Sequence, residues 1–141
     1  MSFQPILLPL LTLVLLTCLG WVYLYILRLS EISRKSIAPQ ELQDRARSQE
    51  LLTESANPSN NLKNLFEMPV LFYVAVLLSM VLLIQDTLLV QLAWGYVLLR
   101  FVHSAVHCTY NRVMHRFIAY ATSCLFLLFM WVRLASYILT H

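Results

Sequence analysis

The sequence predicts an all-α integral membrane protein, a bundle of four transmembrane helices within a single transmembrane domain over residues 1–141. Of these 141 residues, 60% are hydrophobic and 12% are charged, and a soluble domain of this size could not bury so much apolar surface. The apolar residues also form runs long enough to cross a hydrocarbon core of about 30 Å at about 1.5 Å per residue. Lipid must therefore solvate much of the chain.

Charge and cysteine content exclude several classes of protein. The net charge is +3, and the ten Lys and Arg residues form no basic face with interleaved aromatic residues, so the chain is not expected to bind nucleic acid. Cys18, Cys108 and Cys124 lie far apart without a Cys-x-x-Cys spacing. This argues against a disulfide scaffold and a zinc site, and we expect three small apolar side chains within helices.

The first helix is predicted over about residues 5–28. The apolar run has no basic region before it and no small-residue cleavage site after it, so we expect a retained span rather than a signal peptide. A polar stretch, residues 30–61, follows. Within it, Pro39 suits a first helical turn and Glu41 suits the positive end of a helix dipole. A short helix over 39–52 is therefore expected on the membrane surface.

The remaining three helices follow with short connections. A turn is predicted at 57–61, where Asn, Pro and Ser cluster, and the second helix is predicted over about 62–84. Gln85 and Asp86 alone interrupt the apolar pattern before the third helix at about 87–110, so these two helices should form a tight antiparallel hairpin. Residues 111–116 should connect the third helix to the fourth, at about 117–140.

The distribution of basic residues predicts the orientation in the membrane. They concentrate in or beside two loops, 30–61 and 111–116, whereas the 85–86 turn has none and the C-terminal part has Arg133. Basic loops face the cytoplasm, so both termini are expected to be non-cytoplasmic. The basic residues of the two loops are Arg28, Arg34, Lys35, Arg45, Arg47 and Lys63 for the first, and Arg112 and Arg116 for the second.

The third predicted helix carries a polar stripe inside the membrane. Its members recur with helical spacing along one face and are Arg100, His103, Ser104, His107 and Asn111. Arg100 lies about 15 Å inside the cytoplasmic end of this helix, where a central arginine costs on the order of 3 kcal/mol. It therefore needs a partner or a water-filled cavity.

The second helix offers a partner for Arg100. Asn60, Asn64 and Glu67 share one helical face, and an Arg100–Glu67 pair is geometrically reasonable between antiparallel neighbours. Two interpretations remain open. Either these polar groups only hold the helices together, or they line a cavity that opens to the cytoplasm and binds an anionic ligand. Further polar residues lie at the mouth of such a cavity, namely Arg112, His115, Arg116 and Tyr120.

Other chemistries receive less support from the sequence. His103 and His107 have the spacing of a metal-ligand pair, but neither an HExxH motif nor a cluster of carboxylates accompanies them, so no metal site is expected. Bis-histidine haem ligation needs a histidine on a facing helix, and His115 and His141 lie at helix ends. Ser104 lies in no nucleophile elbow. With two glycines in the chain, a glycine-rich phosphate loop is excluded.

The polar motifs resemble a known family. They are Asn64-Leu65-Phe66-Glu67 in the second helix, the segment from Arg100 to His107 in the third, and the following Asn111, Arg112, Arg116 and Tyr120. This pattern resembles the membrane-associated proteins in eicosanoid and glutathione metabolism, with the greatest similarity to the branch that contains microsomal prostaglandin E synthase. The resemblance covers most of the chain, including the helix order and the long first loop.

The resemblance implies a homotrimer with a glutathione site between neighbouring subunits, on the cytoplasmic half of the bundle. Ser104 stands for a threonine of the family, Lys63 for an arginine and His107 for a tyrosine. Asn60 replaces an arginine that contacts glutathione in many members. The positions that match the family in residue type are Asn64, Glu67, Arg100, His103, Arg112, Arg116 and Tyr120.

By this resemblance, the chain is a glutathione-dependent transferase or peroxidase that acts on a lipophilic electrophile entering from the bilayer. Arg116, or as second choice Arg112, would stabilise the glutathione thiolate, which is the attacking species. The carboxylates and the amine of glutathione would contact Lys63, Asn64, Glu67 and Arg100. The other residues of the site would be His103, Ser104, His107 and Tyr120. Arg28 and Arg34 of the adjacent subunit would assist.

A second hypothesis is a non-catalytic membrane subunit or lipid-binding protein with the same fold. The substitutions Asn60 and His107 favour it. Asn60 replaces an arginine that contacts glutathione in many members, and Lys63 cannot form the bidentate contact of an arginine with a carboxylate. Stabilisation of the purified protein by glutathione would distinguish the two hypotheses.

Overall fold

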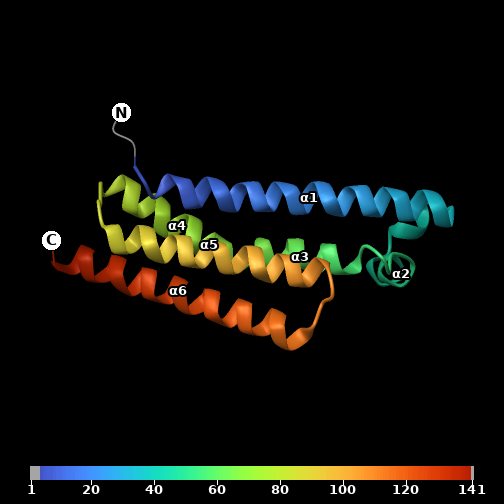
Figure 1. Ribbon diagram of the computed structural model, residues 1–141. Helices are drawn as coiled ribbons and strands as arrows, with labels where there is room; N and C mark the ends of the chain where they lie inside the picture. The colour runs from blue at the N-terminus through green and yellow to red at the C-terminus, as the bar shows by residue number, and fades with distance from the viewer. Residues whose placement is uncertain (1–3, 141) are drawn as a thin grey trace.

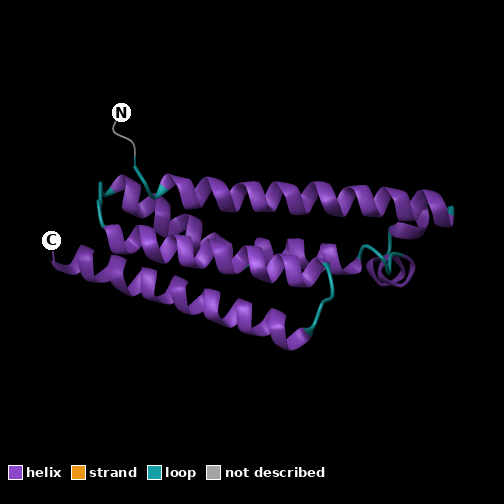
Figure 2. Ribbon diagram, viewed as in Figure 1, coloured by secondary structure: helices purple, strands orange, loops and turns teal. Residues whose placement is uncertain are grey.

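The computed structural model describes residues 4–140, and within this range it is helical, without strands (Figures 1 and 2). Four segments are long and apolar enough to cross a membrane, and they lie side by side along one axis (Figure 1). They are α1 (Leu7–Lys35), α3 (Ala56–Leu65) together with α4 (Met68–Val81), α5 (Thr87–Cys108) and α6 (Val113–Thr140). The predicted all-α bundle of four membrane-length helices is confirmed.

Helix α1 extends beyond its predicted end near residue 28. Its 29 residues correspond to about 43 Å at 1.5 Å per residue, more than a hydrocarbon core of about 30 Å requires. The helix ends where Ser36 takes a left-handed conformation with φ 51°, and the N–H of Ile37 donates to the carbonyl of Ile32. Helix α1 is therefore longer than one membrane crossing requires, and the prediction placed its end too early.

The polar segment after α1 forms two short helices at the end of the bundle. A 3₁₀ turn, η1 (Pro39–Leu42), precedes α2 (Arg45–Leu51), whose first turn is capped by the Asp44 carboxylate accepting from the N–H of Ala46 at 3.1 Å. In Figure 1, α2 is seen end-on and therefore crosses the bundle axis. The predicted short helix over 39–52 is thus present, divided into two pieces.

The predicted turn at 57–61 is wrong, because these residues belong to α3. Pro58 lies in the first turn of α3, where its missing N–H needs no helical partner. The buried carboxylate of Glu31 in α1 accepts hydrogen bonds from the N–H groups of Glu54 and Ser55, at 2.9 and 3.0 Å, and from Ser55 Oγ at 2.9 Å. This contact, together with Lys35 Nζ at 2.6 Å from the same carboxylate, fixes the start of α3 at Ala56.

The second span is not one continuous helix. Pro69 cannot donate the hydrogen bond that the carbonyl of Leu65 would accept, and Glu67 between α3 and α4 has non-helical dihedrals, φ −92° and ψ −98°. The span ends at Val81, three residues earlier than predicted, and Leu83 in the following turn has φ 54°. Residues of the predicted second helix therefore divide into two helical pieces around Glu67.

Helices α5 and α6 pack most extensively against each other. Helix α5 matches its predicted start and ends at Cys108, whereas α6 begins at Val113, four residues before its predicted start. The core is formed where all four spans meet, and side chains from each of them are fully buried there. Examples are Leu13 of α1, Phe72 of α4, Val97 of α5 and Met130 of α6.

Gly95 permits the close approach of α5 and α6, because a Cβ atom at this position would overlap Cε1 and Cδ1 of Phe126. We expect Gly95→Ala to lower the thermal unfolding temperature, with an overpacking cost of about 1 to 3 kcal/mol. Gly95→Ala combined with Phe126→Leu should recover much of the loss. Gly20→Ala is the control, since its Cβ would meet Leu65 Cδ1 at an ordinary 3.5 Å. Equal effects of the two glycine substitutions would contradict this account.

Asp86 joins the α4–α5 turn to α6. Its carboxylate caps α5 by accepting from the N–H groups of Leu88 and Leu89, at 2.8 and 3.3 Å, and it lies 2.7 Å from Arg133 Nη2. Burial alone would raise the pKa of Asp86, but the hydrogen bonds from Arg133 and the two N–H groups outweigh it and lower the pKa below its ordinary value.

The lowered pKa predicts how stability depends on acidity. A carboxyl whose pKa is lower in the folded state contributes stability above its unfolded pKa of about 3.9, and this contribution disappears as the pH falls through the folded pKa. We therefore expect Asp86→Asn to reduce the thermal unfolding temperature at neutral pH. The substitution should have little effect once the pH lies below the pKa of Asp86 in the folded protein. The measurement is thermal unfolding of both proteins across an acid titration. A constant difference at every pH would refute the role of the charge.

Candidate functional site

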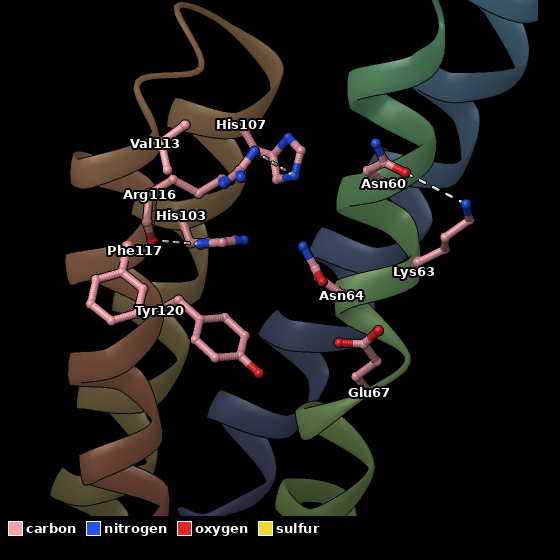
Figure 3. Close-up of a pocket in the computed structure, with 10 residues that line it drawn as sticks. All are labelled: Asn60, Lys63, Asn64, Glu67, His103, His107, Val113, Arg116, Phe117 and Tyr120. Carbon is pink, nitrogen blue, oxygen red and sulfur yellow. Dashed lines mark hydrogen bonds between the residues drawn. The ribbon is translucent and has the colours of Figure 1, made fainter. Parts of the chain in front are cut away.

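A polar pocket of about 420 Å³ lies between α3 and α6, with α5 at its back. Figure 3 shows its two walls facing one another, α3 with the α3–α4 junction on one side and α5 with α6 on the other. The pocket contains acidic, basic, amide and aromatic side chains together, which is the kind of lining that fixes a small polar ligand. Its lining residues are Asn60, Lys63, Asn64, Glu67, His103, His107, Val113, Arg116, Phe117 and Tyr120.

Helix α3 supplies one wall. Asn60 and Asn64 lie one turn apart, and the side chains of Asn64 and Glu67 point into the space between the walls (Figure 3). Lys63 Nζ lies 3.5 Å from Asn60 Oδ1, at the limit of a hydrogen bond. Because Glu67 lies in the break between α3 and α4 and is exposed, its carboxylate is available to a ligand.

Helices α5 and α6 supply the opposite wall, which is held together by Arg116. Its carbonyl lies 3.0 Å from His103 Nδ1, and its guanidinium Nη1 donates to Asn111 Oδ1 at 2.8 Å and lies 3.4 Å from His107 Nε2. Both guanidinium contacts use Nη1. Among residues 4–140, Nη2 and Nε therefore remain as donors for a ligand, on a side chain whose position is already fixed.

The aromatic and imidazole rings of this wall are in mutual contact. The ring centres of His103 and His107 lie 5.6 Å apart, and those of His103 and Tyr120 also lie 5.6 Å apart. His103 and His107 are each 2% exposed. The two histidines of the predicted stripe thus line the back of the pocket, and Tyr120 forms part of its surface.

Arg100 lies behind this wall and does not form the predicted pair with Glu67. It is fully buried, and its Nε donates to Tyr96 Oη at 3.1 Å. Its guanidinium carbon lies 5.3 Å from the ring centre of Tyr96 and 4.8 Å from that of Tyr120. The arginine is therefore stabilised by two tyrosine rings rather than by a carboxylate. Its Nη1 and Nη2 have no hydrogen-bond partner within residues 4–140.

Two other predicted site residues also lie outside the pocket lining. Ser104 is 5% exposed and buried in the bundle, and Arg112 is exposed in the connection between α5 and α6. Their separation from the pocket favours Arg116 over Arg112 as a ligand-contacting arginine. The structure brings together the remaining predicted residues, which are Lys63, Asn64, Glu67, His103, His107, Arg116 and Tyr120.

Sequence reasoning missed two apolar residues of the lining, Val113 and Phe117. They share a face of α6 with Arg116 and Tyr120. Starting the fourth helix at Val113 would have revealed them, since the same helical spacing includes all four residues. In the described part of the chain, no group of three or more His, Cys, Asp or Glu side chains lies close enough to hold a metal ion.

Comparison with known proteins gives one match. The model of the MAPEG family, the membrane-associated proteins in eicosanoid and glutathione metabolism, matches residues 6–136. This family includes glutathione-dependent transferases and peroxidases as well as non-catalytic members, and glutathione use is common in it. No curated protein and no solved structure matches the chain, and no relative supports the microsomal prostaglandin E synthase branch. Because the family match covers nearly the whole chain and four helices can span a membrane, this protein is an integral membrane member of the MAPEG family.

Proposed function

We propose that the protein is a glutathione-dependent transferase or peroxidase that acts on a lipophilic electrophile. The observation that carries this proposal is the combination of charges around the α3–α6 pocket, whose lining includes Glu67, Lys63 and two amides on the α3 side and Arg116 on the α6 side. Glutathione carries two carboxylates, one ammonium group, two peptide groups and a thiol. A volume of about 420 Å³ lies within the ordinary range for small-molecule sites, about 300 to 1,000 Å³.

Several parts of glutathione have a complementary group in the pocket. The ammonium would pair with Glu67, a carboxylate would contact Lys63, and the amide of Asn64 would bond to a peptide group. Lys63 acts as a point charge and cannot form a bidentate pair with a carboxylate. We therefore expect weaker glutathione binding than an arginine at this position would give.

The chemistry rests on the ionisation of the glutathione thiol. The Arg116 guanidinium beside the sulfur lowers the pKa of the thiol, so a proton passes to solvent and the thiolate forms. In conjugation, the thiolate forms a carbon–sulfur bond with the electrophile while a leaving group departs with its electron pair. In peroxide reduction, two glutathione molecules are oxidised to the disulfide, and the hydroperoxide is reduced to an alcohol and water.

We also propose that the protein is a homotrimer and that the α2 end of the bundle faces the cytoplasm. A neighbouring subunit of a homotrimer would cover the pocket between α3 and α6. Arg34 of α1 is already paired with Glu54, so Arg28 is the better candidate for a contribution across subunits. The basic loop with α2 faces the cytoplasm by the positive-inside rule. A lipophilic substrate would enter from the bilayer, past the exposed apolar side chains of the helices.

Thermal unfolding with and without glutathione tests the proposal. A ligand at 100 times its dissociation constant should stabilise the purified protein by about 2.7 kcal/mol, and we expect a concentration-dependent rise in unfolding temperature. Glutathione disulfide, which lacks the thiol, serves as the comparison ligand. The absence of any shift at millimolar glutathione would favour the alternative, a non-catalytic or lipid-binding member. That alternative rests on Asn60 and His107, which both line the pocket.

A further inference from the structure

A second recess, of about 490 Å³, runs between α1 and α3 on the side away from α6. Helix α1 contributes one face, with residues spaced by three and four positions, and α3 contributes a matching face. The recess is cationic at one end and largely apolar at the other, where Glu67 is the one charged side chain. From α1 the lining residues are Trp21, Leu24, Tyr25 and Arg28, and from α3 and its junction they are Ser59, Leu62, Lys63, Phe66 and Glu67.

The polarity of this recess follows the depth of a lipid leaflet. Arg28 comes 21 residues after Leu7 at the start of α1, about 32 Å along the helix, and so lies at the edge of a hydrocarbon core of about 30 Å. Trp21 lies about 10 Å deeper, and its ring centre is 4.8 Å from that of Tyr25. The apolar end therefore lies at the depth of acyl chains and the cationic end at the depth of lipid phosphates.

A third recess, of about 300 Å³, continues past Arg28 and Lys63 toward α2. Arg28, Ser59 and Lys63 belong to both recesses. The lining of the third recess includes hydroxyl and amide groups and no carboxylate. Its polar uncharged members are Ser48, Gln49, Ser55, Ser59 and Asn60. The two recesses together form an amphiphilic groove, with an apolar chain compartment, two cations, and a compartment suited to a hydroxylated headgroup.

The two cations of the groove are not neutralised by carboxylates. Arg28 Nε is buried and has no hydrogen-bond partner in the described part of the chain, and Lys63 Nζ has one long contact of 3.5 Å with an amide. Their basic neighbours differ, since Arg34 pairs with Glu54 and Lys35 pairs with Glu31. An anion between Arg28 and Lys63 would accept charge-assisted hydrogen bonds from the guanidinium and ammonium groups.

Glu67 is the one acidic residue of the groove, and it lies at the apolar end. It follows Lys63 by one helical turn and therefore lies deeper in the membrane than the cations. Trp21 and Phe66, also at the apolar end, are 52% and 63% exposed. These rings offer an apolar surface to an acyl chain, and the cations beyond them offer positive charge to a phosphate.

We propose that this groove binds one acidic phospholipid of the leaflet at the α2 end of the bundle. The phosphate lies between Arg28 and Lys63, an acyl chain lies along Trp21 and Phe66, and the headgroup contacts the hydroxyl and amide groups near α2. Phosphatidylglycerol has the required phosphate and hydroxyl groups. The bound lipid ties α2 to the bundle. Because Lys63 lines both this groove and the α3–α6 pocket, lipid binding is measured in the absence of glutathione.

The test is native mass spectrometry of the purified protein in neutral detergent without glutathione, titrated with phosphatidylglycerol, phosphatidylcholine, oleate or inorganic phosphate. We expect one phosphatidylglycerol per chain, bound in preference to the other three. Arg28→Gln should weaken this binding roughly ten-fold, as expected for loss of one charge-assisted hydrogen bond. Arg45→Gln, which removes an exposed arginine of α2 outside the groove, should leave it unchanged.

A second pair of variants keeps the proposal testable if Arg28→Gln does not fold. Phe66→Ala should weaken binding of the acyl chain, whereas Phe129→Ala, which alters a similarly exposed ring outside the groove, should not. Equal binding of phosphatidylglycerol and phosphatidylcholine would overturn the proposal, as would equal binding of oleate or of inorganic phosphate. An assembled protein that binds no lipid in this titration would also overturn it.

Discussion

Arg116→Gln is expected to lower kcat/KM for glutathione conjugation and peroxide reduction by roughly 100-fold or more. This is the effect expected when one preorganised hydrogen-bond donor to the thiolate is removed. The guanidinium is fixed at the pocket by Asn111 and His107, so its charge can stabilise the thiolate without reorganisation. Glutamine keeps hydrogen-bonding capacity but removes the charge. The measurements are turnover with a chloronitrobenzene and with a lipophilic hydroperoxide.

A spectroscopic measurement separates the proposed role from simple loss of the fold. Bound thiolate absorbs in the ultraviolet, and Arg116→Gln should raise the pH at which this absorbance appears. Arg112→Gln tests the rival arginine, which is exposed outside the pocket, and Arg45→Gln is the control for charge alone. Loss of turnover in Arg112→Gln together with full turnover in Arg116→Gln would contradict the proposal, because it would show that Arg112 stabilises the thiolate.

Glu31→Gln is expected to lower the free energy of unfolding by about 2 to 3 kcal/mol. The cost arises because hydrogen bonds to a charged group are lost while their donors remain buried. The carboxylate is 1% exposed and accepts from two N–H groups and one hydroxyl at the start of α3, as well as from Lys35. Glutamine would direct an NH₂ group at some of these donors. The measurement is thermal or denaturant unfolding of the purified variant.

Glu54→Gln is the matched control for Glu31→Gln. Glu54 pairs with Arg34, but their side chains are 52% and 62% exposed, and exposed ion pairs contribute about 0 to 1 kcal/mol. We expect a small effect for Glu54→Gln. If both substitutions destabilise the protein equally, the buried carboxylate does not anchor α1 to α3.

The membrane spans could be predicted because their signal is local. Each apolar run is long enough to cross the lipid core, and the Asp86 cap lies directly beside the helix that it begins. The start of α3 could not be predicted in this way, since the carboxylate that fixes it, Glu31 of α1, lies 24 residues before Ser55. The cluster at 57–61 has the composition of a turn, and a tertiary contact overrides this preference.

Much of the candidate site could be predicted from helical spacing, which grouped Asn64 with Glu67 and His103 with His107. The partner of Arg100 could not be predicted, because depth alone does not distinguish a carboxylate from an aromatic ring. Tyr96 lies one turn from Arg100 on the same helix and accepts its hydrogen bond. Glu67 lies in the break before α4, where helical spacing no longer describes its direction.

The most direct test of the proposed function is a density map of the purified protein with bound glutathione. We predict density for the tripeptide in the pocket between α3 and α6, with its ammonium group at Glu67 and its sulfur within contact distance of the Arg116 guanidinium. Glutathione density at a different place in the bundle, or a pocket without density under conditions where glutathione stabilises the protein, would contradict the account.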